Sequence, residues 1–390
     1  MAVESFELTV EALRARRCTK WNKFPETVIP AWVADMDFAV AEPIQQSIME
    51  LVKHRDYGYG ARTGEVSLEQ AFADRMKECF GWEPDPELVQ PTSELIQSVY
   101  SAIAAFSEPG DGIVIQTPIY PPFLVALDQL NRRLVDNKLR DDGHRFVLDA
   151  EGLRRSIDAD TKMLLVVNPH NPSGRAYERA ELQALGDVAV EHDLVIVADE
   201  IHADLVFGER RHIPIATLSP EVAARTITIT SATKSFNIPG LRCSVMHFGS
   251  PELRARFHTR FPERMMGQVN VIGIDATVAA WRHGQPWLDD VMARLAQNRD
   301  RLAQFVKAEM PGVRHYAPEA TYLAWLDCRA LDLPSSPFEF FLDEACVGLN
   351  DGADFGIHGI GHVRLNFATS APILDEVLNR MAHALEVRAR

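Results

Sequence analysis

The chain has 390 residues, of which 46% are hydrophobic, and it carries a formal net charge of −15. This length predicts two lobes, or one large domain with a smaller one, and the apolar content is enough for a sizeable core. An acidic chain repels phosphate backbones, so nucleic acid is not an expected partner, and no apolar run reaches the roughly 18 residues that a membrane span requires.

The five cysteines are scattered along the chain, and no two of them form a C-x-x-C pair. Their odd number and wide spacing argue against a disulfide framework and against a structural zinc site. The start of the chain lacks the basic and apolar stretches of a secretory leader. These features predict a protein of a reducing compartment, the cytoplasm.

The first part of the chain predicts alternating strands and helices. Residues 1–40, rich in aromatic residues and prolines, are expected to be irregular and to lie over another surface. Helical spacing of apolar residues predicts helices over 95–106 and 178–193. Short, β-branched and almost wholly apolar runs predict strands at 112–118, 162–169, 194–200, 225–233 and 243–249. Such strands are buried on both faces, so we expect an α/β fold with a mostly parallel sheet between helices.

The pattern changes after residue 267. Amphipathic helices are expected at 286–309, 337–346 and 373–389, with apolar segments at 321–328 and 362–368 between them. This part predicts a smaller α+β lobe. We therefore divide the chain into an N-terminal arm with part of the small domain (1–50), a large domain (51–285) and a C-terminal small domain (286–390).

Polar side chains follow the predicted strands, at the edge where parallel sheets bind their ligands. Tyr120 follows the first strand, Asn168, His170 and Asn171 the second, Asp199, Glu200, His202 and Asp204 the third, and Ser231, Thr233 and Lys234 the fourth. Each of them alone has an ordinary structural explanation, as a cap, a turn residue or a packed ring. Together they bring an amine, a carboxylate, an imidazole and an amide to one edge of the sheet.

This combination suits pyridoxal 5′-phosphate (PLP). Lys234 stands among small, hydroxyl and apolar residues, where a partly buried amine can form an imine with an aldehyde. Asp199 can hold the pyridine nitrogen protonated, and Asn171 and His202 are candidate partners of the ring hydroxyl. The large domain is therefore expected to bind this cofactor.

The phosphate of the cofactor requires an anion site. Ser231, Arg242 and the backbone amides of residues 94–96, at the start of a predicted helix, are candidates, because guanidinium groups and helix N-termini both bind phosphate. Glu94 and Leu95 are assigned to the cofactor site for this reason.

Eight segments carry a resemblance to a known family. They are "WVADMDF" (32–38), "YGYGART" (57–63), "PGDGIVIQTPIYPPF" (109–123), "NPHNPSG" (168–174), "DEIHADL" (199–205), "SATKSFNIPGL" (231–241), "PEATYLAWLDCR" (318–329) and "VRLNFA" (363–368). With them the chain resembles the PLP-dependent enzymes of fold type I, in the class I/II aminotransferase superfamily. Within that superfamily it is similar to the MalY/PatB branch of cystathionine β-lyases (C–S lyases). The resemblance implies an aspartate aminotransferase-like fold.

The resemblance also implies roles for single residues. Lys234 would bind the cofactor covalently, Asp199 would pair with the pyridine nitrogen, Asn171 and His202 would surround the ring hydroxyl, Tyr120 would stack on the ring, and Arg364 would bind the α-carboxylate of an amino-acid substrate. Asn171 and Tyr120 would also contact the substrate, and Tyr120 would join Lys234 in catalysis. Tyr59 would reach the phosphate of the other subunit's cofactor, so a homodimer with shared active sites is expected.

Two positions depart from the pattern of this branch. Glu94 stands where related lyases commonly have glycine, and its carboxylate could face the phosphate, cap the helix or point into the substrate pocket. Arg242 stands where lyases often have a neutral residue and aminotransferases usually have arginine. Both departures suggest a specialised member of the branch.

The implied reaction is β-elimination from an S-substituted cysteine, cystathionine-like or an S-conjugate of secondary metabolism, which releases a thiol, pyruvate and ammonia. An aminotransferase would share every cofactor residue, so that alternative stays open. Decarboxylating oxidative deamination of an S-conjugated cysteine, known from lyase-like enzymes of lincosamide-antibiotic pathways, stays open too. Neither "WVADMDF" nor "TPIYPPF" contains a second arginine for a side-chain carboxylate, although Arg62 is a further candidate for that task.

Three other functions are disfavoured. The segment "GYGARTG" (58–64) resembles a dinucleotide loop, but no predicted strand precedes it. His192 and His202 flank a predicted strand without the Cys/His cluster of a metal site, so no metal is expected. A non-catalytic regulator that binds the cofactor would need a DNA-binding extension, which this acidic chain lacks.

Overall fold

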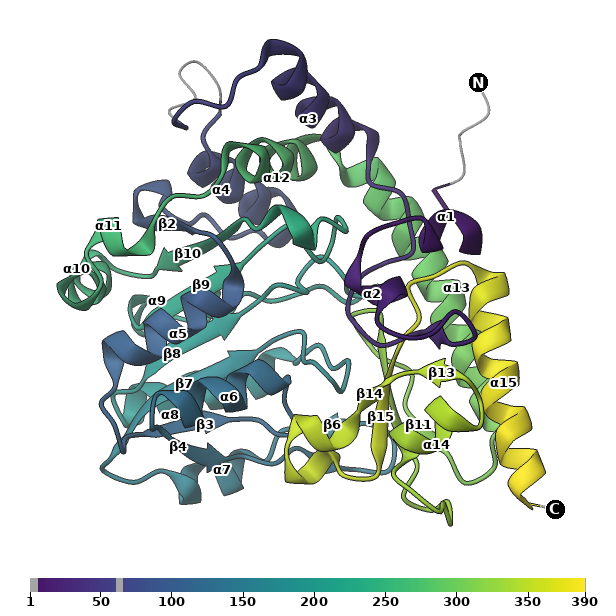
Figure 1. Cartoon of the computed structure of the whole chain (residues 1–390). Helices are drawn as coiled ribbons and strands as arrows, with labels where there is room; N and C mark the ends of the chain where they lie inside the picture. Colours follow the sequence, from purple (N-terminus) through teal and green to yellow (C-terminus); the bar gives the residue numbers. More distant parts are fainter. Residues whose placement is uncertain (1–5, 61–65, 390) are drawn as a thin grey trace.

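The computed structural model describes residues 6–60 and 66–389. Its centre is a seven-stranded sheet with the order β2-β10-β9-β8-β7-β3-β4 (Figure 1). The strands are β2 (Val89–Thr92), β3 (Gly112–Ile115), β4 (Arg133–Asp136), β7 (Thr161–Val167), β8 (Val195–Asp199), β9 (Thr226–Thr230) and β10 (Ser244–Phe248). All neighbouring strands from β4 to β9 are parallel, and only β10 runs antiparallel to its neighbours β9 and β2. The predicted mostly parallel sheet is therefore confirmed.

Alternating side chains of the central strands enter two different cores. Leu165 and Val167 of β7 pack in one apolar cluster, and Leu164 and Val166 pack in the other. The helices around the sheet are α5 (Leu95–Phe106), α6 (Pro121–Gln129), α7 (Ala150–Ser156), α8 (Arg179–Glu191), α9 (Pro220–Ala224), α10 (Pro251–Arg260) and α11 (Glu263–Met266). Residues of α5 and α6 lie in the first cluster and residues of α7 and α8 in the second. The sheet is thus covered on both faces, which explains why its strands are apolar without alternation.

A second, four-stranded sheet lies beside the first and has the order β11-β12-β15-β14. Its strands are β11 (Arg314–His315), β12 (Leu323–Asp327), β14 (Asn350–Asp351) and β15 (His362–Asn366), and the helices with it are α13 (Gln285–Glu309), α14 (Pro337–Asp343) and α15 (Ala371–Ala389). Figure 1 shows α13 and α15 side by side at the outer flank of this lobe. The helices predicted after residue 285 are present, although α14 ends three residues before the predicted boundary.

The beginning of the chain belongs spatially with its end. Two short helices, α1 (Val10–Arg14) and α2 (Thr19–Asn22), precede β1 (Ile29–Pro30), which pairs with β13 (Val347–Gly348). The expectation of an irregular segment over residues 1–40 was therefore wrong in part. The buried Lys20 and Asp37, whose Nζ and Oδ2 atoms are 2.9 Å apart, help to hold this arm in place.

Several elements were absent from the expectations. The helices α3 (Glu42–His54), α4 (Leu68–Phe80) and α12 (Val271–His283) and the strand pair β5 (Arg140–Asp141) and β6 (Phe146–Val147) are among them, as are β2 and β4. The strand predicted over 112–118 ends at Ile115, and the strand predicted over 225–233 ends at Thr230, because the chain leaves the sheet there. None of the described helices combines the length and apolar character needed to cross a bilayer.

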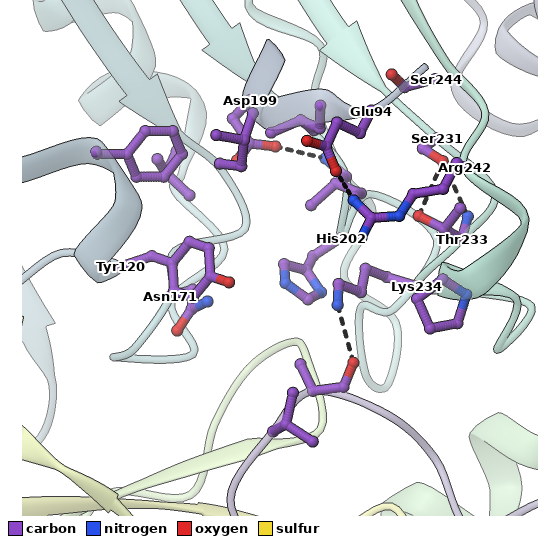
Figure 2. Close-up of a pocket in the computed structure, with 18 of the residues that line it drawn as sticks. Glu94, Tyr120, Asn171, Asp199, His202, Ser231, Thr233, Lys234, Arg242 and Ser244 are labelled. Carbon is purple, nitrogen blue, oxygen red and sulfur yellow. Dashed lines mark hydrogen bonds and ion pairs between the residues drawn. The ribbon is translucent and has the colours of Figure 1, made fainter. Parts of the chain in front are cut away.

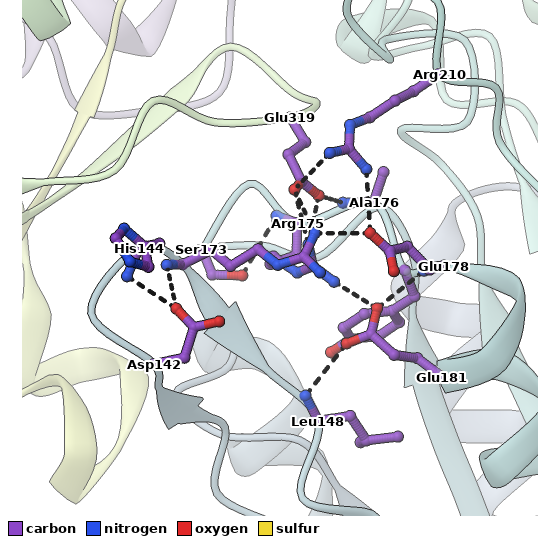
Figure 3. A network of polar contacts seen from close by, with 12 residues as sticks. Asp142, His144, Leu148, Ser173, Arg175, Ala176, Glu178, Glu181, Arg210 and Glu319 are labelled. Atoms are coloured by element: carbon purple, nitrogen blue, oxygen red, sulfur yellow. Dashed lines mark hydrogen bonds and ion pairs between the residues drawn. The ribbon is translucent and has the colours of Figure 1, made fainter.

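A buried ionic network joins the two lobes (Figure 3). Glu319, in the loop before β12, accepts hydrogen bonds from Arg175 Nη1 at 2.7 and 2.8 Å and from the backbone N–H of Ala176 at 3.1 Å. The two chain segments touch so closely that a Cβ atom on Gly174, which has φ +70°, would lie 2.3 Å from Pro318 Cβ. Glycine is required there, and the junction fixes the loop that follows β7 against the small lobe.

Candidate active site

A cavity of about 320 Å³ lies at the carboxyl ends of the parallel strands (Figure 2). All of the predicted site residues except Tyr59 line it, namely Glu94, Leu95, Tyr120, Asn171, Asp199, His202, Ser231, Lys234, Arg242 and Arg364. The volume falls within the range of ordinary cofactor and ligand pockets.

The sheet register explains why these residues meet. Asp199, the last residue of β8, pairs with Val167 of β7 on one side and with Ile229 of β9 on the other. Asn171 follows β7 by four residues and Ser231 follows β9 directly. Parallel strands that end at the same level bring residues distant in sequence to one edge.

Lys234 lies in the cavity with its amine turned toward the N-terminal arm. Its Nζ donates a hydrogen bond to the carbonyl oxygen of Ala34 at 2.8 Å. Burial lowers the pKa of the Lys234 amine to about 8, although the nearby Asp35 carboxylate opposes the change. A lysine with a depressed pKa is a better nucleophile and proton acceptor near neutral pH.

Asp199 is a buried carboxylate that forms no ion pair with any residue the structure describes. Only 4% of the residue is exposed, and Oδ1 accepts a hydrogen bond from the backbone N–H of Ile201 at 3.0 Å. Burial raises the pKa of Asp199 to about 7. A cation bound in the cavity would stabilise its charged form.

His202 presents an unpaired polar atom to the same region. The residue is 3% exposed, and its Nδ1 has no hydrogen-bond partner among the described residues. Burial, with the charges of Lys234 and Arg364, lowers the pKa of His202 to about 3, so its imidazole is neutral. His202 lines the cavity, so this atom is available for a hydrogen bond with a ligand there.

Arg364, on β15, closes the cavity from the small lobe. Its Nη1 donates to Asn171 Oδ1 at 2.9 Å, and its Nη2 donates to Asn350 Oδ1 at 2.6 Å and to the Trp32 carbonyl oxygen at 3.3 Å. The guanidinium is 2% exposed and forms no ion pair within residues 6–60 and 66–389, and burial lowers its pKa to about 10. A buried cation without an anion is a site for a carboxylate ligand.

The opposite end of the cavity holds hydroxyl groups and an ion pair. The Ser231 hydroxyl lies 2.5 Å from the Cys243 carbonyl oxygen and accepts the Thr233 N–H at 3.1 Å. Arg242 forms an ion pair with Glu94, which is the N-cap residue of α5 but makes no side-chain capping bond. Of the three orientations considered for Glu94, helix capping is therefore wrong. Glu94 lines the cavity with its carboxylate at Arg242, and the phosphate-facing and substrate-facing alternatives both stay open.

Of the two tyrosines that the sequence assigned to the site, only Tyr120 lies in the cavity. Tyr120 is the N-cap residue of α6 and lies in the cavity, 6.1 Å from Phe123 between ring centroids. Tyr59 is 99% exposed and lies outside the cavity of its own chain. Arg62 lies outside the described residues.

Sequence reasoning missed several contacts. Asn350 and the carbonyl group of Trp32 hold Arg364, and the carbonyl group of Ala34 holds Lys234. Only tertiary contacts reveal these roles. The motif "WVADMDF" carried the one available signal, since it contains both Trp32 and Ala34. The part of the chain that the structure describes contains no group of three or more His, Cys, Asp or Glu side chains that could hold a metal ion.

Comparison with known proteins agrees with the family resemblance seen in the sequence. The profile of the family "Aminotransferase class I and II" matches residues 33–381. Cystathionine beta-lyase PatB of Bacillus subtilis is 33% identical over 373 residues, which cover 94% of this chain and 96% of that protein.

Solved structures agree with this result. The structure of OvoB is 37% identical, covers 99% of both chains and superposes with a TM-score of 0.92. A PLP-bound C-S lyase from Staphylococcus hominis is 29% identical, covers 97% of this chain and 98% of its own, and superposes with a TM-score of 0.89. The aspartate aminotransferase-like fold and the resemblance to the MalY/PatB branch are confirmed. The chain belongs to the class I and II aminotransferase family.

Proposed function

We propose that the protein is a PLP-dependent C–S β-lyase that converts an S-substituted cysteine and water into a thiol, pyruvate and ammonia. The observation that carries this proposal is that Lys234, Asp199 and Arg364 face one cavity, each with a perturbed pKa and none with an ion-pair partner among the described residues. The names of PatB and of the C-S lyase from Staphylococcus hominis support the reaction class.

The residues present fit the cofactor. Among the described residues Asp199 has no ion-pair partner, and a protonated pyridine nitrogen would supply one; the buried Nδ1 of His202 has no hydrogen-bond partner among them either. Lys234 would hold the cofactor covalently, and Asn171 and Tyr120 would contact its ring. Ser231, Arg242 and the start of α5 at Glu94 and Leu95 would hold its phosphate. When bound, PLP supplies an electron sink that stabilises negative charge at the substrate Cα.

The protein side chains direct the reaction. The guanidinium of Arg364 binds the substrate α-carboxylate through two parallel hydrogen bonds, and this contact orients the Cα–H bond. The neutral Nζ of Lys234 accepts the Cα proton, since its depressed pKa suits general base catalysis. Loss of the thiolate from Cβ then breaks the carbon–sulfur bond, and the thiolate takes up a proton.

The cavity favours a substrate with an uncharged group on sulfur. Its lining contains two described arginines, Arg242 and Arg364. Arg242 is already paired with Glu94, and Arg364 is assigned to the α-carboxylate. A side-chain carboxylate, which a dicarboxylate aminotransferase must bind, therefore finds no free guanidinium in the described lining.

The test offers the holoenzyme S-benzylcysteine, whose sulfur substituent is uncharged, without added keto acid. Cystathionine, whose sulfur substituent is charged, serves as the comparison. Equal amounts of thiol and pyruvate support elimination. Turnover that requires a keto acid and yields a new amino acid would establish the aminotransferase instead. An aldehyde and carbon dioxide, formed only in the presence of oxygen, would establish the decarboxylating oxidative deaminase.

The assembly we propose is a homodimer with shared active sites. Met49 and Val52 of α3 and the neighbouring Tyr57 and Tyr59 are more than half exposed in the single chain. Such a group of exposed apolar and aromatic side chains is typical of an interface. Tyr59 would then reach the cofactor phosphate of the partner.

The proposed division of the chain into 1–50, 51–285 and 286–390 is supported by the two separate sheets and by the pairing of β1 with β13. A reducing, cytoplasmic location is supported by the free thiols of Cys18, Cys79, Cys243, Cys328 and Cys346.

A further inference from the structure

The carboxylate of Glu94 lies where the structure would otherwise offer an anion site. Glu94 precedes the 12-residue helix α5 and makes no capping bond with it, so it leaves the N–H groups of the first turn to other partners. Leu95 and Ile96, the first two residues of the helix, line the cavity. Figure 2 shows the Glu94 side chain reaching to Arg242, beside Ser231 and Thr233.

Arg242 is the cation that remains for an anion at this end of the cavity. It follows the 3-10 turn Pro239–Leu241 in a left-handed conformation with φ 52°. Of the other two cationic side chains in the described lining, Lys234 donates to Ala34, and Arg364 is held by Asn171 at the opposite end. A phosphate bound here must therefore share Arg242 with Glu94.

We propose that Glu94 is a built-in competitor of the cofactor phosphate, which occupies Arg242 in the empty enzyme and lowers the affinity for phosphate monoesters. A carboxylate and a phosphate bind a guanidinium in the same manner, so the two anions exclude each other or repel at close range. The proposal rests on the proposed function, because it takes this end of the cavity as the phosphate subsite.

The exposure of the pair sets the size of the effect. The side chains of Arg242 and Glu94 are 61% and 42% exposed, so water screens their attraction. The phosphate can displace Glu94, and the cofactor still binds. Removal of the Glu94 charge should tighten PLP binding roughly two- to fivefold, as expected for loss of one screened competitor.

The experiment compares apoenzymes of the wild type and of Glu94→Gln, which keeps the shape of the side chain. Dissociation constants for PLP, for pyridoxal and for inorganic phosphate are measured by quenching of tryptophan fluorescence and by thermal shift. We expect tighter binding of PLP and phosphate and unchanged binding of pyridoxal, which lacks the phosphate. The matched control is Glu108→Gln, because Glu108 forms a comparably exposed ion pair with Arg260 at a remote surface.

Arg242→Gln supplies the second test. If Glu94 acts through Arg242, the gain from Glu94→Gln should largely disappear in the Arg242→Gln background. Equal PLP affinity of wild type and Glu94→Gln, equal gains for PLP and pyridoxal, or a gain that persists without Arg242 would each overturn the proposal. A wild-type protein that binds no PLP would overturn the proposed function itself. If Glu94→Gln fails to fold, Glu94→Gly is measured in its place.

Discussion

Asn171 and Arg364 are 193 positions apart, yet the Nη1 of Arg364 donates a hydrogen bond to Asn171 Oδ1 at 2.9 Å. The contact joins the loop after β7 to β15 of the small lobe. Asn350 holds the other terminal nitrogen at 2.6 Å, so neutral acceptors fix the plane of the guanidinium without cancelling its charge. The cation is thus preorganised for an anionic group of the substrate.

Replacement of Arg364 by lysine should lower kcat/KM by roughly two to three orders of magnitude. A lysine keeps the charge but cannot form the planar fork, and it leaves the acceptors of Asn171 and Asn350 unpaired. Steady-state kinetics with an S-substituted cysteine measures the loss, and circular dichroism checks the fold. Arg314→Lys is the control, since Arg314 is 48% exposed and pairs with Asp327 at the surface. A KM within a factor of two of wild type would contradict the assignment.

Asp199 should make the apoprotein less stable as the pH rises. Its pKa is raised from 3.8 to about 7 in the folded chain, so between about pH 4 and pH 7 the folded state binds a proton that the unfolded state has released. Stability therefore falls over this window. Asp199→Asn removes the titration, and the apo variant should exceed wild type at pH 8 by at most about 4 kcal/mol, at 1.36 kcal/mol per pKa unit.

Urea unfolding of both apoproteins at pH 4.5 and pH 8 tests this prediction. The difference should fall to about 1 kcal/mol at pH 4.5, where the unfolded Asp199 is still partly protonated. Asp193→Asn, whose side chain is 95% exposed, should show no difference at either pH. PLP should stabilise wild type more than the variant, because only the carboxylate pairs with a protonated ring nitrogen. An apo variant less stable than wild type at pH 8 would show that burial of the ionised Asp199 carboxylate does not destabilise the folded chain.

Glu319→Gln should destabilise the folded protein by about 2 kcal/mol, because the buried guanidinium of Arg175 loses the carboxylate at Nη1 but keeps the ion pair of Nη2 with Glu181. The Arg175 side chain is 2% exposed, and the Glu319 side chain is 14% exposed (Figure 3). Denaturant unfolding measures the change. Glu191→Gln, at an exposed pair 3.9 Å from Arg154, should cost less than about 1 kcal/mol. Equal effects of the two variants would mean that the junction between the lobes adds no stability.

The sequence was most informative where local pattern and position coincide. The strands β7, β8 and β9 are buried on both faces and stand out as apolar runs. The residues that follow them can therefore be placed at one edge of the sheet from the sequence alone. Asp199 and Lys234 could be assigned to the same edge by this argument alone, since a parallel sheet aligns the ends of their strands.

Other features depend on contacts that no local pattern encodes. Asn350 lies on the two-residue strand β14 and meets Arg364 only because β14 pairs with β15. Helix α12 was missed because small residues such as Gly273, Ala276 and Ala280 lie on its buried side, where α3 and α4 pack against it. The ion pair between Glu94 and Arg242 joins two segments that are distant in the sequence. The sequence could therefore only raise the question of where the Glu94 carboxylate points.

Shared active sites should allow two inactive variants to restore each other. Lys234→Ala removes the proton acceptor within one subunit, and Tyr59→Ala removes a side chain that, in the proposed dimer, serves the partner. Tyr59 is 99% exposed in its own chain and contributes nothing to its own cavity. In a mixed dimer, one site combines an intact Lys234 with the intact partner Tyr59, and the other site lacks both. Random mixing of equal amounts should therefore recover about a quarter of the wild-type activity.

A second mixture separates sharing from simple stabilisation. Lys234→Ala mixed with Asp199→Asn should recover nothing, because Lys234 and Asp199 line the cavity of the same chain and every mixed site keeps one defect. Native mass spectrometry of isotope-labelled subunits shows that exchange has occurred in both mixtures. If exchange is complete and the Tyr59→Ala mixture stays inactive, each subunit works alone and the exposed Tyr59 belongs to another surface. Recovery in both mixtures would instead show that contact between subunits repairs a folding defect, since two defects in one cavity cannot complement through a shared site.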